Sequence, residues 1–356
     1  MSKTGVVSAY IHTEPHSAQA ANSQPEPNDA FVEFHDFVFG NGGTLASLKL
    51  HYLTLGTPRH DASGAIVNGV LLLHGTAGSA ADLAQTAFFD TLYGAGQPLD
   101  LSRYFLVIPD AIGAGKSSKP SDGLRANFPH YGYKDQVRAQ HLLLERIGIK
   151  HLKLVLGTSM GGMQTWLWGE MFPNDTDCLV AIASTPAAIS GRNMVWREMI
   201  SEAIRSDPAW NNGDYPKDSP PKNWIKAVIP LSAIMTGSAG QLQKQAPTRE
   251  TAIDLVGKLE AEGEAYDAND MLYAFESSAD YDPAPMLNAI IKPMLTINFA
   301  DDLTNPPEHL HLPAASNYTE VMIPAGAASY GHMNLAHPAV WVPALQSFLQ
   351  RLPYER

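Results

Sequence analysis

The residues best suited to chemistry are two glycines that flank a serine at two-residue spacing: Gly157, Ser159 and Gly161. An apolar run at 152–156 precedes them, and a helix-like segment at 160–172 follows. A serine on such a tight turn projects its hydroxyl from the edge of a sheet, and the glycines remove side chains that would collide there. The unpaired amides of the helix would face an oxyanion at the serine. The pattern predicts Ser159 as a nucleophile; the alternative is a structural joint whose serine only caps the helix.

A serine hydroxyl needs a general base within hydrogen-bond reach, and the base needs a carboxylate to orient it. For a nucleophile on a strand–turn–helix corner, the chain order is serine, acid, histidine. We predict His332 as the base because it follows the last expected strand; a structural, hydrogen-bonded histidine is the alternative. Asp301 and Asp302 both follow the next-to-last expected strand. Adjacent side chains on an extended chain point in opposite directions, so only one should reach the histidine. We favour Asp301, with Asp302 as the alternative acid.

A second glycine-containing loop, His-Gly-Thr-Ala-Gly at 74–78, follows the apolar run 70–73. In a serine enzyme with this chain order, such a loop supplies one of the two amides that bind the oxyanion. We expect these amides to belong to Thr76 and Met160. The alternative is that the loop is a simple glycine turn.

Composition limits what the substrate can be. The 356 residues include 24 basic and 36 acidic side chains, for a net charge of −12, which argues against nucleic acid or an anionic membrane and favours a small molecule. With a single cysteine, the chain can form no internal disulfide and no cysteine metal cluster. The run 112–117 ends like a phosphate-binding loop, but Asp110 stands where that motif requires glycine, so we reject nucleotide binding. We expect no cofactor and no metal.

The location of the protein is predicted from two absences in the sequence. No apolar run approaches the ~18 residues of a membrane span. The N-terminal apolar piece at 5–11 is too short and too closely followed by polar residues to be a signal sequence. We therefore predict a cytoplasmic protein.

The elements that must position these groups follow from the hydrophobic pattern. Two alternating segments suit an antiparallel pair at a sheet edge, and four continuous apolar runs suit buried parallel strands separated by helices. Two further segments near the C-terminal end resume the sheet. After residue 185 the alternation stops for about a hundred residues, which predicts an inserted helical lid. The expected strands are 31–39, 48–55, 69–73, 104–108, 152–156, 179–182, 294–299 and 319–323. The predicted organisation is a mobile arm at 1–29, a core at 30–185, the lid at 186–290 and the rest of the core at 291–356.

The whole pattern resembles the α/β-hydrolase fold, a mostly parallel eight-stranded sheet flanked by helices with an inserted lid. Within that fold it resembles the homoserine O-acetyltransferase-like branch. The residues that carry the resemblance are Arg138-Ala-Gln140, the run 157–164, Asp207-Pro-Ala-Trp210 and Asp267-Ala-Asn269. It implies Ser159, Asp301 and His332 as the catalytic triad, and a possible homodimer.

Departures from that branch concern the substrate. Its G-S-T-G-P stretch reads Gly-Ala-Gly-Lys-Ser-Ser here, at 113–118. Its lid arginine, six residues ahead of the Asp-Pro pair, corresponds to Ser201, and the nearest arginines, Arg197 and Arg205, are out of register. We therefore expect a serine hydrolase that cleaves an ester, thioester or amide through an acyl-enzyme. The alternatives are an O-acyltransferase with an alcohol acceptor other than homoserine, a non-catalytic small-molecule binder, and a hydrolase of carbon–carbon bonds.

Overall fold

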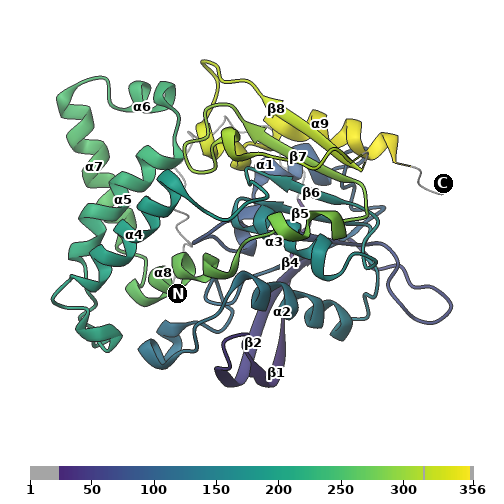
Figure 1. Ribbon diagram of the computed structural model, residues 1–356, viewed down its shortest axis with the longest axis horizontal. Helices are drawn as coiled ribbons and strands as arrows, with labels where there is room; N and C mark the ends of the chain where they lie inside the picture. The colour runs from purple at the N-terminus through teal and green to yellow at the C-terminus, as the bar shows by residue number, and fades with distance from the viewer. Residues whose placement is uncertain (1–23, 316, 353–356) are drawn as a thin grey trace.

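The centre of the computed structural model, which describes residues 24–315 and 317–352, is an eight-stranded sheet (Figure 1). The strand order is β1-β2-β4-β3-β5-β6-β7-β8. β2 pairs antiparallel with both β1 and β4, and all other neighbours pair in parallel. The predicted fold class is thereby confirmed. The strands are β1 (Asn28–Val38), β2 (Thr44–Leu55), β3 (Gly69–Leu73), β4 (Phe105–Pro109), β5 (Leu154–Thr158), β6 (Leu179–Ile182), β7 (Met294–Phe299) and β8 (Tyr318–Ile323).

Burial explains why these segments are strands. Every residue of β3 to β7 is buried, as expected for apolar runs covered on both faces. β1 and β8, at the two edges, alternate between more and less exposed positions. Each expected strand is present, with shifts of up to four residues at its ends. Asn28 and Asp29, which we assigned to the arm, begin β1; residues 1–23 of that arm lie outside the described residues.

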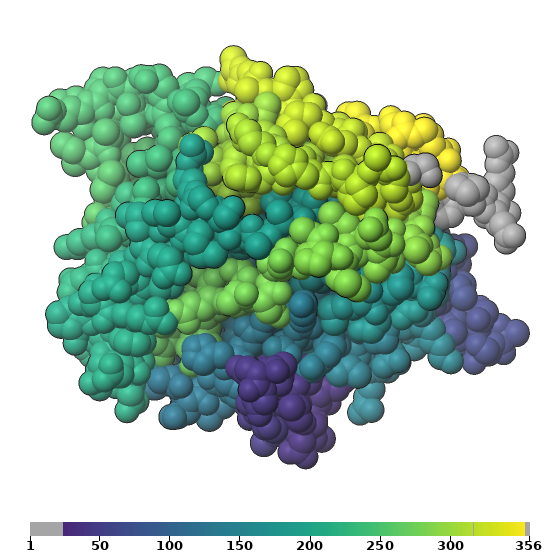
Figure 2. All heavy atoms as spheres, in the orientation of Figure 1, coloured from purple at the N-terminus to yellow at the C-terminus, as the bar shows by residue number. Residues whose placement is uncertain are grey.

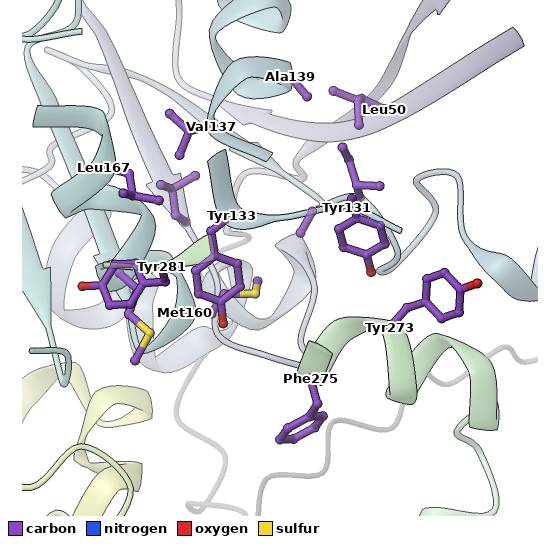
Figure 3. Close-up of a cluster of buried hydrophobic side chains, with 14 of the residues drawn as sticks. Leu50, Tyr131, Tyr133, Val137, Ala139, Met160, Leu167, Tyr273, Phe275 and Tyr281 are labelled. Atoms are coloured by element: carbon purple, nitrogen blue, oxygen red, sulfur yellow. The ribbon is translucent and has the colours of Figure 1, made fainter. Parts of the chain in front are cut away.

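Helices cover both faces of the sheet. α2 (Tyr133–Arg146) and α3 (Met160–Met171) pack on one face, and α1 (Thr86–Phe88) and α9 (Pro338–Arg351) on the other (Figure 1). Figure 3 shows part of the first layer, where the side chains of Tyr133, Met160 and Tyr281 gather in one cluster. This layer holds α3, the helix that begins directly after Ser159, in place, because Met160 and Trp166 of α3 are almost fully buried in it.

Five helices lie between β6 and β7, in the segment for which an inserted lid was predicted. They are α4 (Gly191–Arg205), α5 (Asn223–Thr236), α6 (Ala239–Gln245), α7 (Arg249–Gly263) and α8 (Ala268–Glu276); below, "the lid" means residues 191–276. α4 packs against α5 and α8, and α5 packs against α7. Figure 2 shows the atoms of the lid, coloured teal to green, packed against the core at the left of the view. No helix in the described ranges has both the length and the apolar character to cross a bilayer.

Candidate active site

The turn between β5 and α3 has the geometry of a nucleophile elbow. Ser159 has φ 53° and ψ −113°, a conformation that non-glycine residues rarely adopt. A Cβ on Gly157 would lie 2.0 Å from the carbonyl oxygen of Gly161, and one on Gly161 would lie 2.2 Å from that of Leu73. Both glycines are therefore required by close approach of backbone, as the sequence predicts. The strained turn directs the Ser159 side chain away from the sheet, toward the loops that follow the strands.

Ser159, His332 and Asp302 form a continuous hydrogen-bonded triad. The Ser159 hydroxyl lies 2.9 Å from His332 Nε2, and His332 Nδ1 lies 2.7 Å from Asp302 Oδ2. The three residues are 9%, 4% and 2% exposed, respectively. Since Nδ1–H donates to the carboxylate, Nε2 is left to accept from the serine hydroxyl, the arrangement that general-base activation of a serine needs.

The preference for Asp301 as the acid is wrong. Asp301 Oδ1 accepts a hydrogen bond from the Ser329 hydroxyl at 2.9 Å, whereas Asp302 reaches the histidine. The physical reason is the turn after β7: the Asp302 amide donates to the Phe299 carbonyl at 3.1 Å, so the two aspartates do not lie on extended chain. As we expected, only one of the two contacts His332.

The acid is fixed by backbone on its second oxygen. Asp302 Oδ1 accepts from the amides of Thr304 and Asn305, each at 2.8 Å. With these two bonds in place, only Oδ2 is left to meet the histidine. The orientation of the His332 ring is therefore set by the local fold of the turn after β7.

The loop at 74–78 lies beside the serine. Thr76 lines the same cavity as Ser159 and His332, and Met160 is the first residue of α3, so its amide has no carbonyl one turn earlier in the helix to bind. His74 holds the loop: its Nδ1 donates to the Gly75 carbonyl at 2.8 Å, and its Nε2 accepts from the Ala111 amide at 3.0 Å. An oxyanion role for the Thr76 and Met160 amides stays a prediction, and this placement agrees with it.

The sequence that resembles a phosphate-binding loop has a structural role. Asp110 accepts hydrogen bonds from the amides of Lys116 and Ala80, both at 2.7 Å, and contacts His51 Nδ1 at 2.6 Å. Burial alone would raise the pKa of Asp110, but these hydrogen bonds outweigh it and lower the pKa below its usual value. The Lys116 ammonium pairs with Asp29. The aspartate that breaks the nucleotide-binding motif thus ties its loop to two neighbouring segments.

The lid contributes a buried cation to the catalytic cavity. Arg197, 6% exposed, lines the same cavity of about 70 Å³ as Ser159 and His332. Its Nε donates to Asn193 Oδ1 at 2.9 Å, and its Nη1 donates to the Phe275 carbonyl at 2.8 Å. In the described part of the chain no carboxylate forms an ion pair with it, in contrast to Arg205, which pairs with Glu276. The guanidinium also borders a second cavity of about 850 Å³, on the side of α2 and α8.

Two asparagines connect this arginine to the triad, and sequence reasoning missed both. Asn193 Nδ2 donates to Asn305 Oδ1 at 3.0 Å, and Asn305 Nδ2 donates to the Ala183 carbonyl at 2.7 Å. Asn305 does not cap the short helix that follows, because that helix begins at Pro307 and Pro306 is its N-cap residue. The one signal for this hydrogen bond in the sequence was the polar residue Asn193 in the first turn of a lid helix. Its partner Asn305 lies 112 residues away.

Comparison with known proteins gives four informative matches: one family model, one relative and two solved structures. A family model described as alpha/beta hydrolase fold matches residues 68–331. Homoserine O-acetyltransferase of Geobacter sulfurreducens is 30% identical over 364 residues, covering 89% of this chain and 95% of the relative. The crystal structure of homoserine O-acetyltransferase from Bacillus anthracis matches with a TM-score of 0.79 at 19% identity, over 93% of this chain and all of that one. Esterase E22 matches with a TM-score of 0.79 at 19% identity, over 91% of this chain and all of that one. The expected resemblance is confirmed.

Proposed function

The chain belongs to the α/β-hydrolase fold family and to its homoserine O-acetyltransferase-like branch, and from this premise we propose that it transfers an acyl group through an acyl-serine to an alcohol that carries a carboxylate. The observation that carries the proposal is the buried, unpaired Arg197 in the cavity of Ser159 and His332. The substrates are small molecules. The cytoplasmic location and the homodimer stay predictions.

In the first step, the Ser159 hydroxyl gives its proton to His332 Nε2 while Oγ forms a bond to the acyl carbon. Asp302 remains ionised and stabilises the imidazolium through Nδ1. The amides of Met160 and Thr76 donate to the oxyanion. When the carbonyl re-forms, the bond to the leaving group breaks, and the leaving group takes the proton from His332. In the second step, His332 accepts the proton of the acceptor hydroxyl, whose oxygen attacks the acyl-serine. The bond between the acyl carbon and Ser159 Oγ then breaks, and Oγ takes the proton from His332.

Electrostatics explain why the acceptor should carry a carboxylate. A buried guanidinium without a counter-charge costs several kcal/mol of desolvation, which a carboxylate of the ligand would offset. The Nε and Nη1 groups of Arg197 already donate to Asn193, Phe275 and Ser278, which fixes the guanidinium and leaves Nη2 to donate to a ligand carboxylate. The branch's arginine position is occupied by Ser201, but Arg197 lies four residues earlier on α4 and therefore on the same helix face. The arginine is out of register in sequence and still borders the serine's cavity.

The test compares two alcohols that differ in one group. L-homoserine and 3-aminopropan-1-ol share the amine and the hydroxyl, and only the first carries a carboxylate. With acetyl-CoA as donor, we expect at least tenfold faster ester formation with L-homoserine, and Arg197→Met should remove this difference. Equal rates with the two alcohols in the wild type would overturn the carboxylate assignment. Ser159→Ala should abolish ester formation with either alcohol.

Hydrolysis is the second candidate, favoured by the changed sequence of the 113–118 loop. Water would then replace the alcohol in the second step, with the same triad. Release of free acetate alone, unaffected by any alcohol, would support it. Covalent labelling by a fluorophosphonate tests the step common to both candidates; a wild-type protein that resists labelling would favour the non-catalytic binder.

A further inference from the structure

We infer that the acyl groups this site accepts are longer than acetyl, and that their chains lie in an apolar cavity under the lid. The inference rests on the proposed acyl-serine chemistry and specifies the donor that it uses. It follows from the lining of the cavity, its junction with the catalytic cavity and the position of the general base.

The cavity, of about 90 Å³, is lined by the lid helices α4, α5, α7 and α8, by the loop at 74–78 and by Met333, the residue after the catalytic histidine. Its apolar lining residues that are at most 8% exposed are Trp196, Val228, Ile229, Ala233, Leu259, Met271, Phe275 and Met333. Five lining residues are polar: Thr76, Ser232, Thr236, Glu262 and Tyr266. Ser232 and Thr236 already donate to carbonyls of α5 at 2.8 and 2.9 Å, and Glu262 lies 4.0 Å from the ammonium of Lys258. The larger part of the wall is apolar and suits a hydrocarbon chain.

This cavity and the catalytic cavity are adjacent. They share the lining residues Thr76, Trp196, Thr236, Phe275 and Met333. Figure 3 shows Phe275 extending from α8 away from Tyr131. A substrate bound at Ser159 can therefore reach both spaces: a polar one with Arg197 and an apolar one beneath α5 and α7.

The position of His332 assigns one space to each half of the substrate. The leaving group, and later the acceptor, must exchange a proton with His332 Nε2, so both occupy the cavity that His332 lines, which is the one with Arg197. The apolar cavity is not lined by His332 or Ser159. Thr76, the expected oxyanion donor, lines both cavities, so the acyl carbon sits at their junction with its chain directed into the apolar one.

The volume sets the expected chain length. An apolar cavity of about 150 Å³ holds benzene, so one of about 90 Å³ accommodates roughly three to four carbons. Added beyond the carbon next to the carbonyl, these correspond to pentanoyl and hexanoyl groups. Burying each methylene should raise kcat/KM by roughly threefold to fourfold until the cavity is full.

The test is a chain-length series of p-nitrophenyl esters, from acetate to decanoate, so that the leaving group is constant. For the wild type we expect kcat/KM to rise at least tenfold from acetate to pentanoate or hexanoate and then to fall. Ala233→Leu, which adds bulk to the wall, should shift the optimum toward acetate, and Leu259→Ala should shift it toward longer chains. Val256→Ala, on the exposed side of α7, is the matched control and should keep the wild-type profile.

A general loss of folding cannot shift the chain-length optimum in opposite directions in the two wall variants. The ratio of kcat/KM between two esters, measured on one variant, is also independent of how much of that variant is active. An acetate optimum in the wild type, or unchanged profiles in both wall variants, would overturn the inference. Its failure is distinguishable from failure of the proposed function. Turnover that persists in Ser159→Ala would refute the acyl-serine, and the inference with it. Failure of the alcohol test alone would leave the chain-length result to decide the inference.

Discussion

Replacement of Asp302 by asparagine should disable the base without disturbing the fold. In the wild type, Oδ1 of Asp302 accepts from two backbone amides, and Oδ2 accepts from His332 Nδ1–H. An asparagine must keep its oxygen toward the two amides, because its NH₂ group cannot accept from them. The NH₂ group then faces Nδ1 as a donor and drives the imidazole proton to Nε2. In that tautomer His332 cannot accept the proton of Ser159.

The size of the expected loss of kcat in Asp302→Asn follows from the changed tautomer of His332. A wrong histidine tautomer in a serine triad lowers kcat by roughly 10⁴-fold, or about 5 kcal/mol of activation free energy. Asp301→Asn is the matched control, since among the described residues Asp301 accepts a hydrogen bond only from the Ser329 hydroxyl, and the amide oxygen can replace its carboxylate there. We expect Asp301→Asn to keep activity within about threefold, a change worth less than 1 kcal/mol.

The assay is the initial rate of p-nitrophenyl butanoate hydrolysis at pH 7.5 for both variants, with thermal unfolding measured in parallel. Equal unfolding temperatures would show that the difference in rate is not a difference in folding. If Asp301→Asn lost as much activity as Asp302→Asn, or more, the argument from oxygen placement would fail. The acid would then be Asp301, in a conformation other than the one described here.

Two further predictions concern stability. Gly161→Ala should lower the unfolding temperature of the protein by several degrees or prevent folding, because the added Cβ would lie 2.2 Å from the Leu73 carbonyl oxygen; a melting temperature equal to that of the wild type would show that the elbow can relax. Burial, reinforced by Asp267, raises the pKa of Asp270 to about 7, so the folded protein binds this proton more tightly than the unfolded chain and loses stability as pH rises through about 7. Asp270→Asn should therefore stabilise the protein at pH 8, by roughly 2–4 kcal/mol, and have little effect at pH 4, as measured by urea unfolding; a pH-independent effect would contradict the assignment.

The parts of the fold that could be predicted are those determined by local sequence. The strands of the sheet centre are continuous apolar runs, and burial on both faces leaves little other use for such runs. The elbow was also predictable from local sequence, because its two glycines are required by steric crowding between residues that are close in the chain. His332 could be placed because the chain order of the triad follows from the order of the strands.

The errors arise where a turn or a distant partner decides the outcome. The Asp301 preference assumed extended chain, and a turn that brings the Asp302 amide to Phe299 reversed it. The lid was predicted to be helical, but no sequence pattern marked α5 or α6 as individual helices. α5 contains Pro230, which argues against a helix in any sequence-based interpretation. In the structure α5 is stabilised by its packing against α4 and α7, which no local pattern shows.

The hydrogen bonds between lid and triad explain how the substrate half of this site can change while the triad stays intact. The chain from Arg197 through Asn193 and Asn305 ends at the Asp302 turn, but the bonds that hold Asp302 itself come from backbone amides. A change of lid side chain alters the position of Arg197 and leaves those amides in place. Substitutions on α4 can therefore change which acceptor binds without disabling His332. This is why the chain can have Ser201 at the family's arginine position and still keep an intact triad.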